Sequence, residues 1–479
     1  MSKYLYGAAV QGIQDFIFQT NKLRDIIGAS ELVARVCTTL FSDLMGEASF
    51  AGSTPKAEII VKAAGNIKCL FDDEALCKKA VNEFPRKVML EAPGITISQA
   101  VVTMDDNTTF GDAVEELERR LRIQRNKPAE SLTTGLIGIE RAQATGLPAV
   151  KKDNEGRLID EGTVKKREAG GRQDIALCIK SFGENVRAEN VPFELGDLKE
   201  KNDWIAIIHA DGNGLGRVIE KKGHDMKELS RFSANLDDAT RAAARKTFQD
   251  IKNDYDIRRI IPLRPIVLSG DDMTIICRAD LALDYASLYL KNFELETEKK
   301  GQRLTACAGI AFIKSKFPFY YGYQLAESLC EQANKDALIQ GKDSPSCLMF
   351  HKVQSEFFDN YESIVSQELT PTENISLKYG PYYLKAIEGR WSIENLKKVV
   401  DNLSEEKSNN LKNAVREWLT LIFENPGKAE QRIVRTGILY PEKKDIIDKA
   451  TQSNTRSGIK CYPANDILTL ITIKNLKTR

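Results

Sequence analysis

The chain has 479 residues, of which 42% are hydrophobic and 29% are charged, as in a soluble globular protein of two to four domains. Its 69 lysines and arginines balance 68 aspartates and glutamates, so the net charge does not indicate a nucleic-acid or membrane partner. The sequence contains no apolar run of the roughly 18 residues that a membrane span needs, and its N-terminus lacks a signal-peptide pattern. These features predict a cytoplasmic protein that has no membrane partner.

The cysteines and histidines exclude several kinds of site. The nine cysteines are scattered without any CxxC pair, which favours reduced core thiols and argues against a structural zinc site with cysteine ligands. Of the three histidines, His209 lies in an apolar run and is interpreted as a core residue. The His224–Asp225 pair resembles a phosphohydrolase motif, but that site needs further histidines, so a pair at a helix start is favoured.

Residues 1–105 predict a domain with the order β-α-β-β-α-β. A strand over 3–11 precedes apolar residues at helical spacing over 12–45. Two short strands then surround Gly65 and Asn66, and a helix over 74–90 leads to a strand over 94–104. This order is the split βαβ pattern of a ferredoxin-like domain.

Residues 106–200 are interpreted as a helical and loop insert. The helix predicted over 112–128 carries four arginines, at positions 119, 120, 122 and 125. We interpret them as a solvated helix face, with nucleic-acid contact as the lesser alternative. The polar, glycine-bearing stretch over 145–174 predicts loops.

Residues 201–360 repeat the order of the first domain. Strands are predicted over 204–210, 303–313 and 346–353, and a hairpin over 263–278 has Ser269-Gly270-Asp271-Asp272 at its turn. Helices are predicted from the glycine-rich turn at 211–216 to residue 252, and over 280–298 and 322–338. We therefore expect an α+β protein with two tandem ferredoxin-like (βαββαβ) palm domains. Residues 361–479 predict a mostly helical C-terminal domain, in which 466–473 form a short strand or helix.

The two copies differ in their acids. When the strands are aligned, Gln11-Gly12 falls where Asp211-Gly212 falls, and the turn ending at Asn66 falls where the turn ending at Asp272 falls. The second copy thus has carboxylates at three places where the first has Gln, Gly and Asn. Two copies of one fold would share their structural glycines, so the carboxylates of the second copy indicate chemistry.

Asp211, Asp271 and Asp272 are the candidate catalytic residues. With the carbonyl oxygen of Gly212 they would form an oxygen-rich site for two Mg²⁺ or Mn²⁺ ions, which suits nucleotidyl transfer. The expected nucleotide contacts come from the same two loops, at Gly212, Asn213, Gly214, Ser269 and Gly270. The structural alternative is an Asp-Gly turn before a helix and a Gly-Asp hairpin turn of type I′. The sequence has no Walker loop at either place.

The second copy resembles the palm domain shared by the catalytic large subunit of type III CRISPR effector complexes and by GGDEF diguanylate cyclases. "SGDDMTIIC" is similar to the CRISPR polymerase's GGDD hairpin, with Ser269 replacing the first glycine, and "HADGNGLG" is similar to its first metal-binding loop. Residues 4–33 resemble the family's degenerate first palm, and "KYGPYYL" with the helical tail resembles its C-terminal domain.

This resemblance implies an activity in antiviral defence. ATP would be joined through 3′–5′ linkages, with release of pyrophosphate, into cyclic oligoadenylates that activate a downstream effector. Asp211, Asp271 and Asp272 would hold the metals, and Lys335 would meet the triphosphate unless it is only a solvated lysine at a helix end. Gln11, Gly12 and Asn66 of the first palm would hold a second ATP.

Two departures from the family pattern leave alternatives open. The chain starts at the first palm, without the HD nuclease domain that implies DNase activity, and "RAQATGLPAV" stands where relatives often have a cysteine-bearing zinc finger. We therefore expect a shortened relative without zinc, whose product could also be a cyclic dinucleotide. Expected partners are CRISPR-complex subunits, guide or target RNA, or a second copy of the chain. The competing functions are a non-catalytic scaffold subunit and a diguanylate-cyclase-like enzyme.

Overall fold

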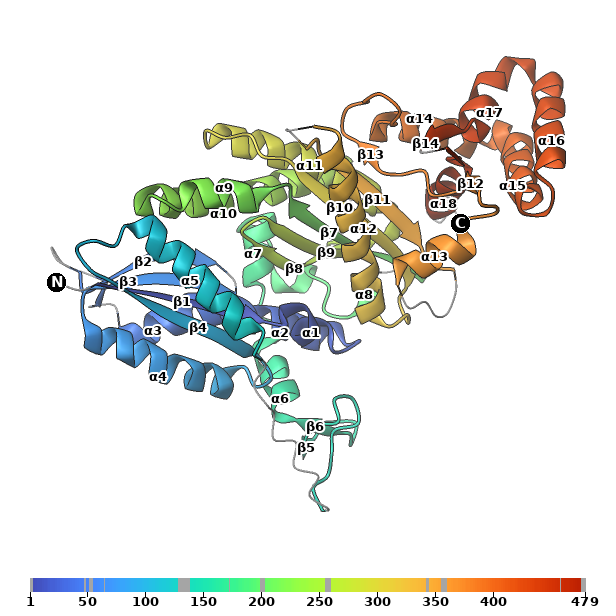
Figure 1. The fold of residues 1–479 in the computed structure, drawn as a ribbon. Coiled ribbons are helices and arrows are strands. Elements are labelled where there is room, and N and C mark those ends of the chain that lie inside the picture. The colour runs from blue at the N-terminus through green and yellow to red at the C-terminus, as the bar shows by residue number, and fades with distance from the viewer. Residues whose placement is uncertain are drawn as a thin grey trace. The chain divides into compact units, whose positions relative to one another are not determined.

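The computed structural model describes residues 3–46, 49–50, 55–63, 65–127, 138–171, 173–198, 203–254, 260–341, 344–354, 360–456 and 458–474. The predicted α+β class is confirmed, since the chain combines helices with two large sheets and two small ones (Figure 1). The chain separates into two compact units. One contains Met1–Leu195, Gly214–Ala242 and Pro265–Asp272, and the other contains Gly196–Asn213, Ala243–Arg264 and Met273–Arg479.

The first sheet is antiparallel, and its strands lie in the order β2-β3-β1-β4. Its strands are β1 (Lys3–Gln11), β2 (Ala57–Ala63), β3 (Asn66–Phe71) and β4 (Thr96–Met104). The helices are α1 (Ile13–Phe18), α2 (Leu23–Arg35), a π-helix (Val36–Leu40), α3 (Phe41–Met45) and α4 (Glu74–Glu91). The chain order therefore follows the sequence pattern of residues 1–105.

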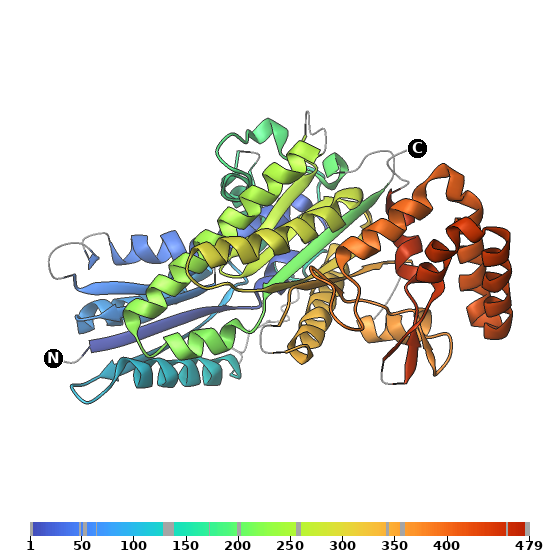
Figure 2. The same ribbon diagram turned by 90° about the horizontal axis from the view of Figure 1, so that it is seen from above.

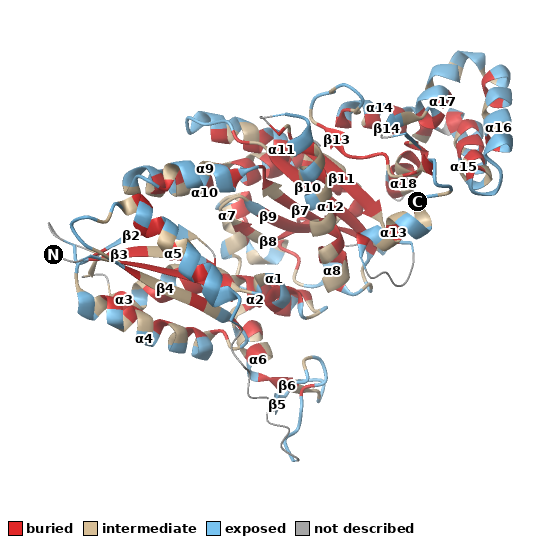
Figure 3. Ribbon diagram, viewed as in Figure 1, coloured by how far each residue is buried: buried red, intermediate tan, exposed pale blue. Residues whose placement is uncertain are grey.

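Side chains of β1 alternate between two helical layers, as the pleat of a strand requires. Leu5 packs in one cluster with Leu117 and Leu121 of α5 (Phe110–Arg125). Tyr6 points to the opposite face, where its ring stacks on that of Phe41 with centroids 5.9 Å apart. Helix α5, which was predicted as part of the insert, thus covers one face of the first sheet, and the central strands β1 and β3 are largely buried (Figure 3).

The insert contains a hairpin that the sequence analysis did not anticipate. Its elements are β5 (Ala149–Lys152), β6 (Leu158–Asp160), α6 (Glu161–Ala169), α7 (Ala176–Phe182), a 3-10 turn (Ala188–Asn190) and α8 (Leu195–Leu198). Helix α6 packs closely on α2 through glycines of both segments. A Cβ atom at Gly28 would lie 1.6 Å from the Lys166 carbonyl oxygen, and one at Gly170 would lie 2.3 Å from that of Arg24.

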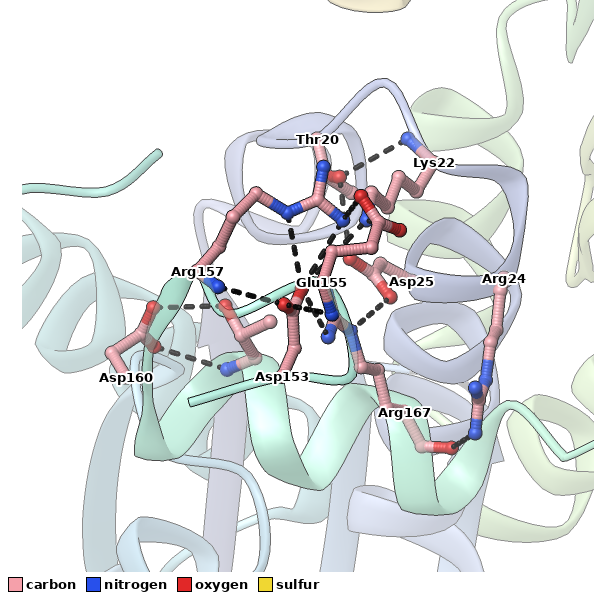
Figure 4. A network of polar contacts seen from close by, with 10 residues as sticks. Thr20, Lys22, Arg24, Asp25, Asp153, Glu155, Arg157, Asp160 and Arg167 are labelled. Carbon is pink, nitrogen blue, oxygen red and sulfur yellow. Dashed lines mark hydrogen bonds and ion pairs between the residues drawn. The ribbon is translucent and has the colours of Figure 1, made fainter. Parts of the chain in front are cut away.

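Ion pairs attach the hairpin to α2 (Figure 4). Arg167 donates from Nε to Asp25 at 3.0 Å and from Nη1 to Asp153 at 3.2 Å. Asp153 also accepts from Nε of Arg157 at 3.1 Å. These residues line a cavity of about 280 Å³. Because Asp25 is only 3% exposed, pairing with Arg167 compensates a carboxylate that has lost most of its water.

The second large sheet has the strand order β13-β11-β10-β7-β9-β8. Its strands are β7 (Trp204–Gly212), β8 (Leu263–Ser269), β9 (Asp272–Arg278), β10 (Ala306–Lys314), β11 (Cys347–Lys352) and β13 (Tyr382–Tyr383). The helices are α9 (Leu215–Lys222), α10 (Met226–Asp254), a 3-10 turn (Ala279–Leu281), α11 (Ala282–Lys299) and α12 (Phe319–Ile339). Its first four strands along the chain lie in the same spatial order as those of the first sheet.

Helix α12 packs on the centre of this sheet. A Cβ atom at Gly309 of β10 would lie 1.9 Å from the Ala326 carbonyl oxygen, and one at Gly322 would lie 2.9 Å from Ile207 of β7. Odd-numbered residues of β7 therefore face α12, and the ring of His209 contacts that of Tyr323 at 5.6 Å.

The C-terminal region is mostly helical, as predicted, and its helices from residue 393 onward form one group in both views (Figures 1 and 2). Residues 466–473, left open between strand and helix, lie in a helix. The elements are α13 (Tyr361–Glu368), β12 (Ile375–Ser376), α14 (Ile393–Ser404), Glu406–Ser408, α15 (Asn409–Glu424), α16 (Pro426–Leu439), Pro441–Lys443, α17 (Lys444–Thr451), β14 (Asn454–Arg456), β15 (Ile459–Cys461) and α18 (Ala464–Lys474).

The cysteine prediction is confirmed, because all nine cysteines are free thiols with buried side chains. Among the described residues, no helix has both the length and the apolar character that crossing a bilayer would require.

Candidate metal and nucleotide site

The first loop of the site begins where β7 loses its apolar character. Ile205, Ile207 and Ile208 are fully buried, whereas Asp211 is partly exposed near the end of the strand. Gly214 follows with φ 64° and ψ 19° and caps α9. A side chain is disfavoured in this left-handed conformation, so glycine allows the chain to turn sharply from strand into helix.

The second loop is the two-residue turn between β8 and β9. Gly270 has φ 61°, but Asp271 does not have a positive φ, since Ser344 is the one non-glycine with positive φ in the described part of the chain. The expected type I′ turn, which needs two positive φ values, is therefore wrong, and a positive φ at the first position alone is typical of type II′. The Thr240 hydroxyl donates to the Gly270 carbonyl at 2.6 Å and supports this turn.

Strand pairing brings the acids of the two loops together. β7 and β9 are antiparallel with Ala210 opposite Met273, so Asp211 and Asp272 occupy neighbouring positions at the same end of the sheet. Both continue the face of His209 and Thr274, which lie opposite one another two residues further into the sheet. Each of Asp211, Asp271 and Asp272 offers a carboxylate oxygen, and these oxygens lie within 4.8 Å of one another.

The donor set fits a hard divalent cation. Mg²⁺ and Mn²⁺ prefer carboxylate and water oxygens as ligands. The three aspartates supply carboxylate oxygens that lie within 4.8 Å of one another. Asp211 and Asp271 are partly buried, while Asp272 is exposed, so water and a phosphate oxygen have access to the remaining coordination positions. The arrangement can hold a divalent cation and bring it to a phosphate-bearing ligand.

The two histidine interpretations are confirmed. His209 is 8% exposed and its Nδ1 lies 3.0 Å from the Thr274 hydroxyl, while burial lowers the pKa of the ring to about 4. His209 is therefore a neutral core residue. Asp225, the partner of His224 in the dipeptide, accepts from the backbone N–H groups of Lys227 and Glu228 at 2.8 and 3.0 Å, which caps the start of α10.

Asn213, an expected nucleotide contact, points into the protein. Its side chain is 8% exposed and donates to the Thr305 hydroxyl at 3.0 Å and to the Ser344 carbonyl at 2.8 Å. The sequence does not reveal these two partners. No local signal could have found them, because they lie 92 and 131 residues from Asn213 along the chain.

Lys335 lies in the last turns of α12 with its side chain 65% exposed, and its ammonium is 3.5 Å from the carboxylate of Glu331. Along α12, Tyr323 contacts His209, and Cys330 contacts the carbonyl of Cys307, which pairs with Asp211. The helix thus runs toward the carboxylate end of the sheet, and Lys335 lies beyond Cys330 in that direction.

The first copy has the same backbone features with a different register from the expected one. Gly12, with φ 59° and ψ 36°, caps α1 as Gly214 caps α9, so these two glycines correspond. Asn66 begins β3 as Asp272 begins β9, and its partner on β1 is Ala9. The counterpart of Asp211 is therefore Ala9 rather than Gln11. The alignment was wrong by two residues because it matched Gly12 to Gly212, whose φ is not positive.

Comparisons with known proteins agree with this reading of the second sheet. Residues 204–345 match the family model of the second palm domain of Cas10/Cmr2. No curated protein matches the chain.

Solved structures with similar folds come from Csm1–Csm4 complexes. A chain of the Csm1–Csm4 cassette in complex with cA4 is 11% identical with a TM-score of 0.58, and the match covers 98% of this chain and 70% of that one. A chain of the Csm1–Csm4 subcomplex in the type III-A CRISPR-Csm interference complex is 14% identical with a TM-score of 0.56, at 98% and 70% coverage. For the cassette in complex with AMPPNP the identity is 12% and the TM-score 0.53, at 98% and 69% coverage.

Residues 204–345, which carry the three carboxylates, therefore match the second palm domain of Cas10/Cmr2, and nearly the whole chain has a fold similar to that of chains solved in Csm1–Csm4 complexes.

Proposed function

We propose that the protein is a metal-dependent nucleotidyltransferase that joins ATP into a cyclic oligoadenylate or a cyclic dinucleotide and releases pyrophosphate. The observation that carries this proposal is the carboxylate trio of Asp211, Asp271 and Asp272 on a Cas10/Cmr2 second palm. Fold-related chains were solved in complex with cA4 and with AMPPNP, which supports an adenine nucleotide as substrate.

The three carboxylates would hold Mg²⁺ or Mn²⁺, with the Gly212 carbonyl as a further oxygen ligand. When bound, the ions lower the pKa of an attacking ribose hydroxyl and neutralise charge on the leaving pyrophosphate. Gly214 and Gly270 lie beside the carboxylates, and no described atom lies within 4 Å of the place where a Cβ would stand on either glycine. A triphosphate can therefore approach the backbone of both loops, and Asn213 and Ser269 lie on the same two loops.

Lys335 would contact the triphosphate from α12. Its ammonium is exposed and its ion pair with Glu331 is a surface pair, which is worth little and is readily exchanged for a phosphate. The direction of α12, toward the carboxylate end of the sheet, supports this role.

The two βαββαβ units would be tandem ferredoxin-like palms, of which the first binds a second ATP without catalysing. Gln11, Gly12 and Asn66 lie at the end of the first sheet that corresponds to the metal site, where Ala9 replaces the first aspartate. The Gln11 Nε2 atom is buried without a hydrogen-bond partner among the described residues, so it can donate to a ligand. We divide the chain into this first palm (1–105), the insert (106–200), the catalytic palm (201–360) and the helical region (361–479).

The biological setting would be antiviral defence of the CRISPR type. The related structures contain Csm4, which makes a Csm4-like subunit a candidate partner for this chain, together with guide or target RNA and an effector that binds the cyclic product. A second copy of the chain is a further candidate partner.

The activity is tested by incubating the full chain with each radiolabelled NTP and Mn²⁺ or Mg²⁺, with and without target RNA and the partner subunit. We expect ATP alone to give pyrophosphate and a product resistant to alkaline phosphatase. The double variant Asp271→Ala, Asp272→Ala should lose about 100-fold or more of this activity because its metal ligands are removed.

Asp105→Ala, Asp106→Ala is the matched control, since it removes two adjacent exposed acids that follow β4. Undiminished product from the Asp271, Asp272 variant would overturn the site assignment. The scaffold function would be favoured if no NTP gave a product under any of these conditions.

A further inference from the structure

The side chain of Asn213 connects the metal loop to two distant segments of the second sheet. Its Nδ2 atom donates to the Thr305 hydroxyl at 3.0 Å and to the Ser344 carbonyl at 2.8 Å, and its backbone N–H donates to the Thr305 carbonyl at 2.9 Å. Thr305 immediately precedes β10, and Ser344 precedes β11. Asn213 is therefore bonded at the end of the sheet where Asp211 pairs with Cys307 of β10.

The hydrogen-bond network fixes which way the amide points. The Ser344 carbonyl can only accept, and it accepts from both Asn213 and the Thr305 hydroxyl, the latter at 2.7 Å. Because the Thr305 hydroxyl has given its hydrogen to Ser344, it can only accept from Asn213. Both contacts therefore require an NH₂ group at Asn213, and a carboxylate could not satisfy either of them.

Ser344 gives this network a defined geometry. Its φ of 35° lies in the left-handed region, where non-glycine residues are disfavoured, and its side chain is 8% exposed. Two donors converge on its carbonyl, which compensates for the unfavourable conformation. Asn213, Thr305 and Ser344 thus form one hydrogen-bonded unit next to the end of β7, in which Asn213 and Ser344 are buried and Thr305 is partly exposed.

We propose that Asn213 is a positioning residue that holds Asp211 in place for the divalent cation, in contrast to the direct nucleotide contact expected from its place in the loop. This inference rests on the proposed function, since it concerns the same metal site. Asn213 is 8% exposed, its Nδ2 is bonded inward, and its Oδ1 is buried without a hydrogen-bond partner among the described residues, so neither polar atom of the side chain is presented to a ligand at the surface.

Substitution by aspartate separates the two roles. If Asn213 bound a cation through its side-chain oxygen, Asn213→Asp would preserve or strengthen that binding. In the positioning role, the same change places a negative oxygen against the Ser344 carbonyl and removes two donors, so Mn²⁺ affinity should fall about 10- to 100-fold, as for other residues that orient metal ligands. Asn213→Ala should lower Mn²⁺ affinity by a similar factor.

The network also predicts how Thr305 behaves. Thr305→Ser keeps the hydroxyl and should bind Mn²⁺ like the unmodified chain. Thr305→Val keeps the shape but removes the hydroxyl, so it should lower Mn²⁺ affinity and be non-additive with Asn213→Ala. This pair also covers the case in which the Asn213 variants do not fold, because valine closely matches threonine in volume.

Asn292 provides the matched control. It is 2% exposed and donates from Nδ2 to the Thr247 hydroxyl and to Asp250, both at 3.1 Å, on helices rather than at the metal loop. Asn292→Asp therefore introduces a comparable repulsion in a buried position whose hydrogen-bond partners, Thr247 and Asp250, are not part of the metal loop. It should lower the thermal unfolding temperature without changing Mn²⁺ affinity.

The experiment titrates each full-length variant with Mn²⁺ by calorimetry or electron paramagnetic resonance and records its thermal unfolding. Lower Mn²⁺ affinity in the Asn213 variants and in Thr305→Val, but not in Thr305→Ser or Asn292→Asp, supports positioning. Retained or tighter binding by Asn213→Asp overturns it while leaving the proposed function intact, and so do equal affinity losses in Asn213→Asp and Asn292→Asp. Absence of Mn²⁺ binding by the unmodified chain refutes the metal site itself, and the positioning role with it.

Discussion

Three carboxylates with oxygens within 4.8 Å of one another repel when no cation is bound. Such a cluster lowers the stability of the folded state unless a cation offsets the repulsion. The first copy has Ala9 and Asn66 at the corresponding positions and avoids this repulsion. The difference between the copies, more than either loop alone, makes the second copy the candidate metal site.

Asp211→Asn should therefore separate stability from binding. Without divalent cations, the variant should unfold at a higher temperature than the unmodified chain, because one of three like charges is removed. Added Mn²⁺ at about 100 times its dissociation constant should stabilise the unmodified chain by about 2.7 kcal/mol and the variant far less. Thermal unfolding in EDTA and in Mn²⁺ measures both effects, and equal stabilisation of the two proteins would contradict the assignment.

The candidate site residues were predictable from the sequence because they are carboxylates in the second copy and not in the first. Asp211, Asp271 and Asp272 stand out in the alignment even though its register was wrong by two residues at the first strand. The register depends on which glycine has a positive φ, and residue type does not distinguish Gly212 from Gly214. The inward bonding of Asn213 was not predictable, because it depends on partners brought close only by the folded sheet.

At the scale of elements, helices and strands with clear apolar periodicity appeared where the sequence placed them. The β5–β6 hairpin was missed because its strands have only four and three residues, β5 is mostly exposed, and the attachment to α2 relies on ion pairs such as Arg167–Asp25. Helix α5 was assigned to the insert on its arginines, yet Val114, Leu117 and Leu121 form an apolar stripe that packs on the first sheet. The arginine content of this helix drew attention away from its apolar periodicity, which indicates packing on a sheet.

The contact between α2 and α6 predicts a stability effect. Gly28→Ala would place a methyl group against the Lys166 carbonyl, a backbone atom that can move only with the whole of α6. We expect a loss of about 1–3 kcal/mol or more in the free energy of unfolding. Gly216→Ala is the control in α9, because no described atom lies within 4 Å of its added methyl group. Denaturant unfolding compares the two, and equal stabilities would show that α6 does not pack on α2 at this glycine.

At the scale of the whole molecule, the repeated strand order was predictable because both copies carry the same succession of periodic segments. The connection of the C-terminal region to the second sheet was not predictable from the sequence. It depends on a two-residue strand, β13, and on Asp336 of α12, which binds Arg390 at 2.6 Å and the Tyr383 hydroxyl. Such short pairings leave no periodic signal in a sequence.

The buried carboxyl group of Asp466 makes the stability of the C-terminal helices depend on pH. Burial raises its pKa to about 7, although the Tyr382 hydroxyl, which donates at 2.7 Å, and Arg456 act to lower the pKa. The unfolded chain ionises this group near pH 4. Between about pH 4 and pH 7 the folded state therefore binds more protons, so the free energy of unfolding falls as the pH rises, by on the order of 4 kcal/mol, and then levels off.

Asp466→Asn keeps an acceptor for Tyr382 but cannot ionise, so it should remove this pH dependence. The stability of the variant relative to the unmodified chain should increase from pH 4 to pH 7. Chemical denaturation at pH 5 and pH 8 measures the difference, and parallel pH profiles for the two proteins would show that Asp466 is not the group responsible.

The position of β13 in the sequence, after the matched palm residues, limits which fragments of the protein can fold. The sequence similarity to the palm family ends at residue 345, but the sheet also includes β11 and the edge strand β13, in which Tyr382 and Tyr383 pair with β11. A fragment cut at the family boundary would lose β11 and β13, expose the edge of β10 to aggregation, and leave Asp336 without Arg390. A fragment of the second palm intended for expression by itself therefore has to extend through Trp391, whose carbonyl accepts from the Tyr383 backbone.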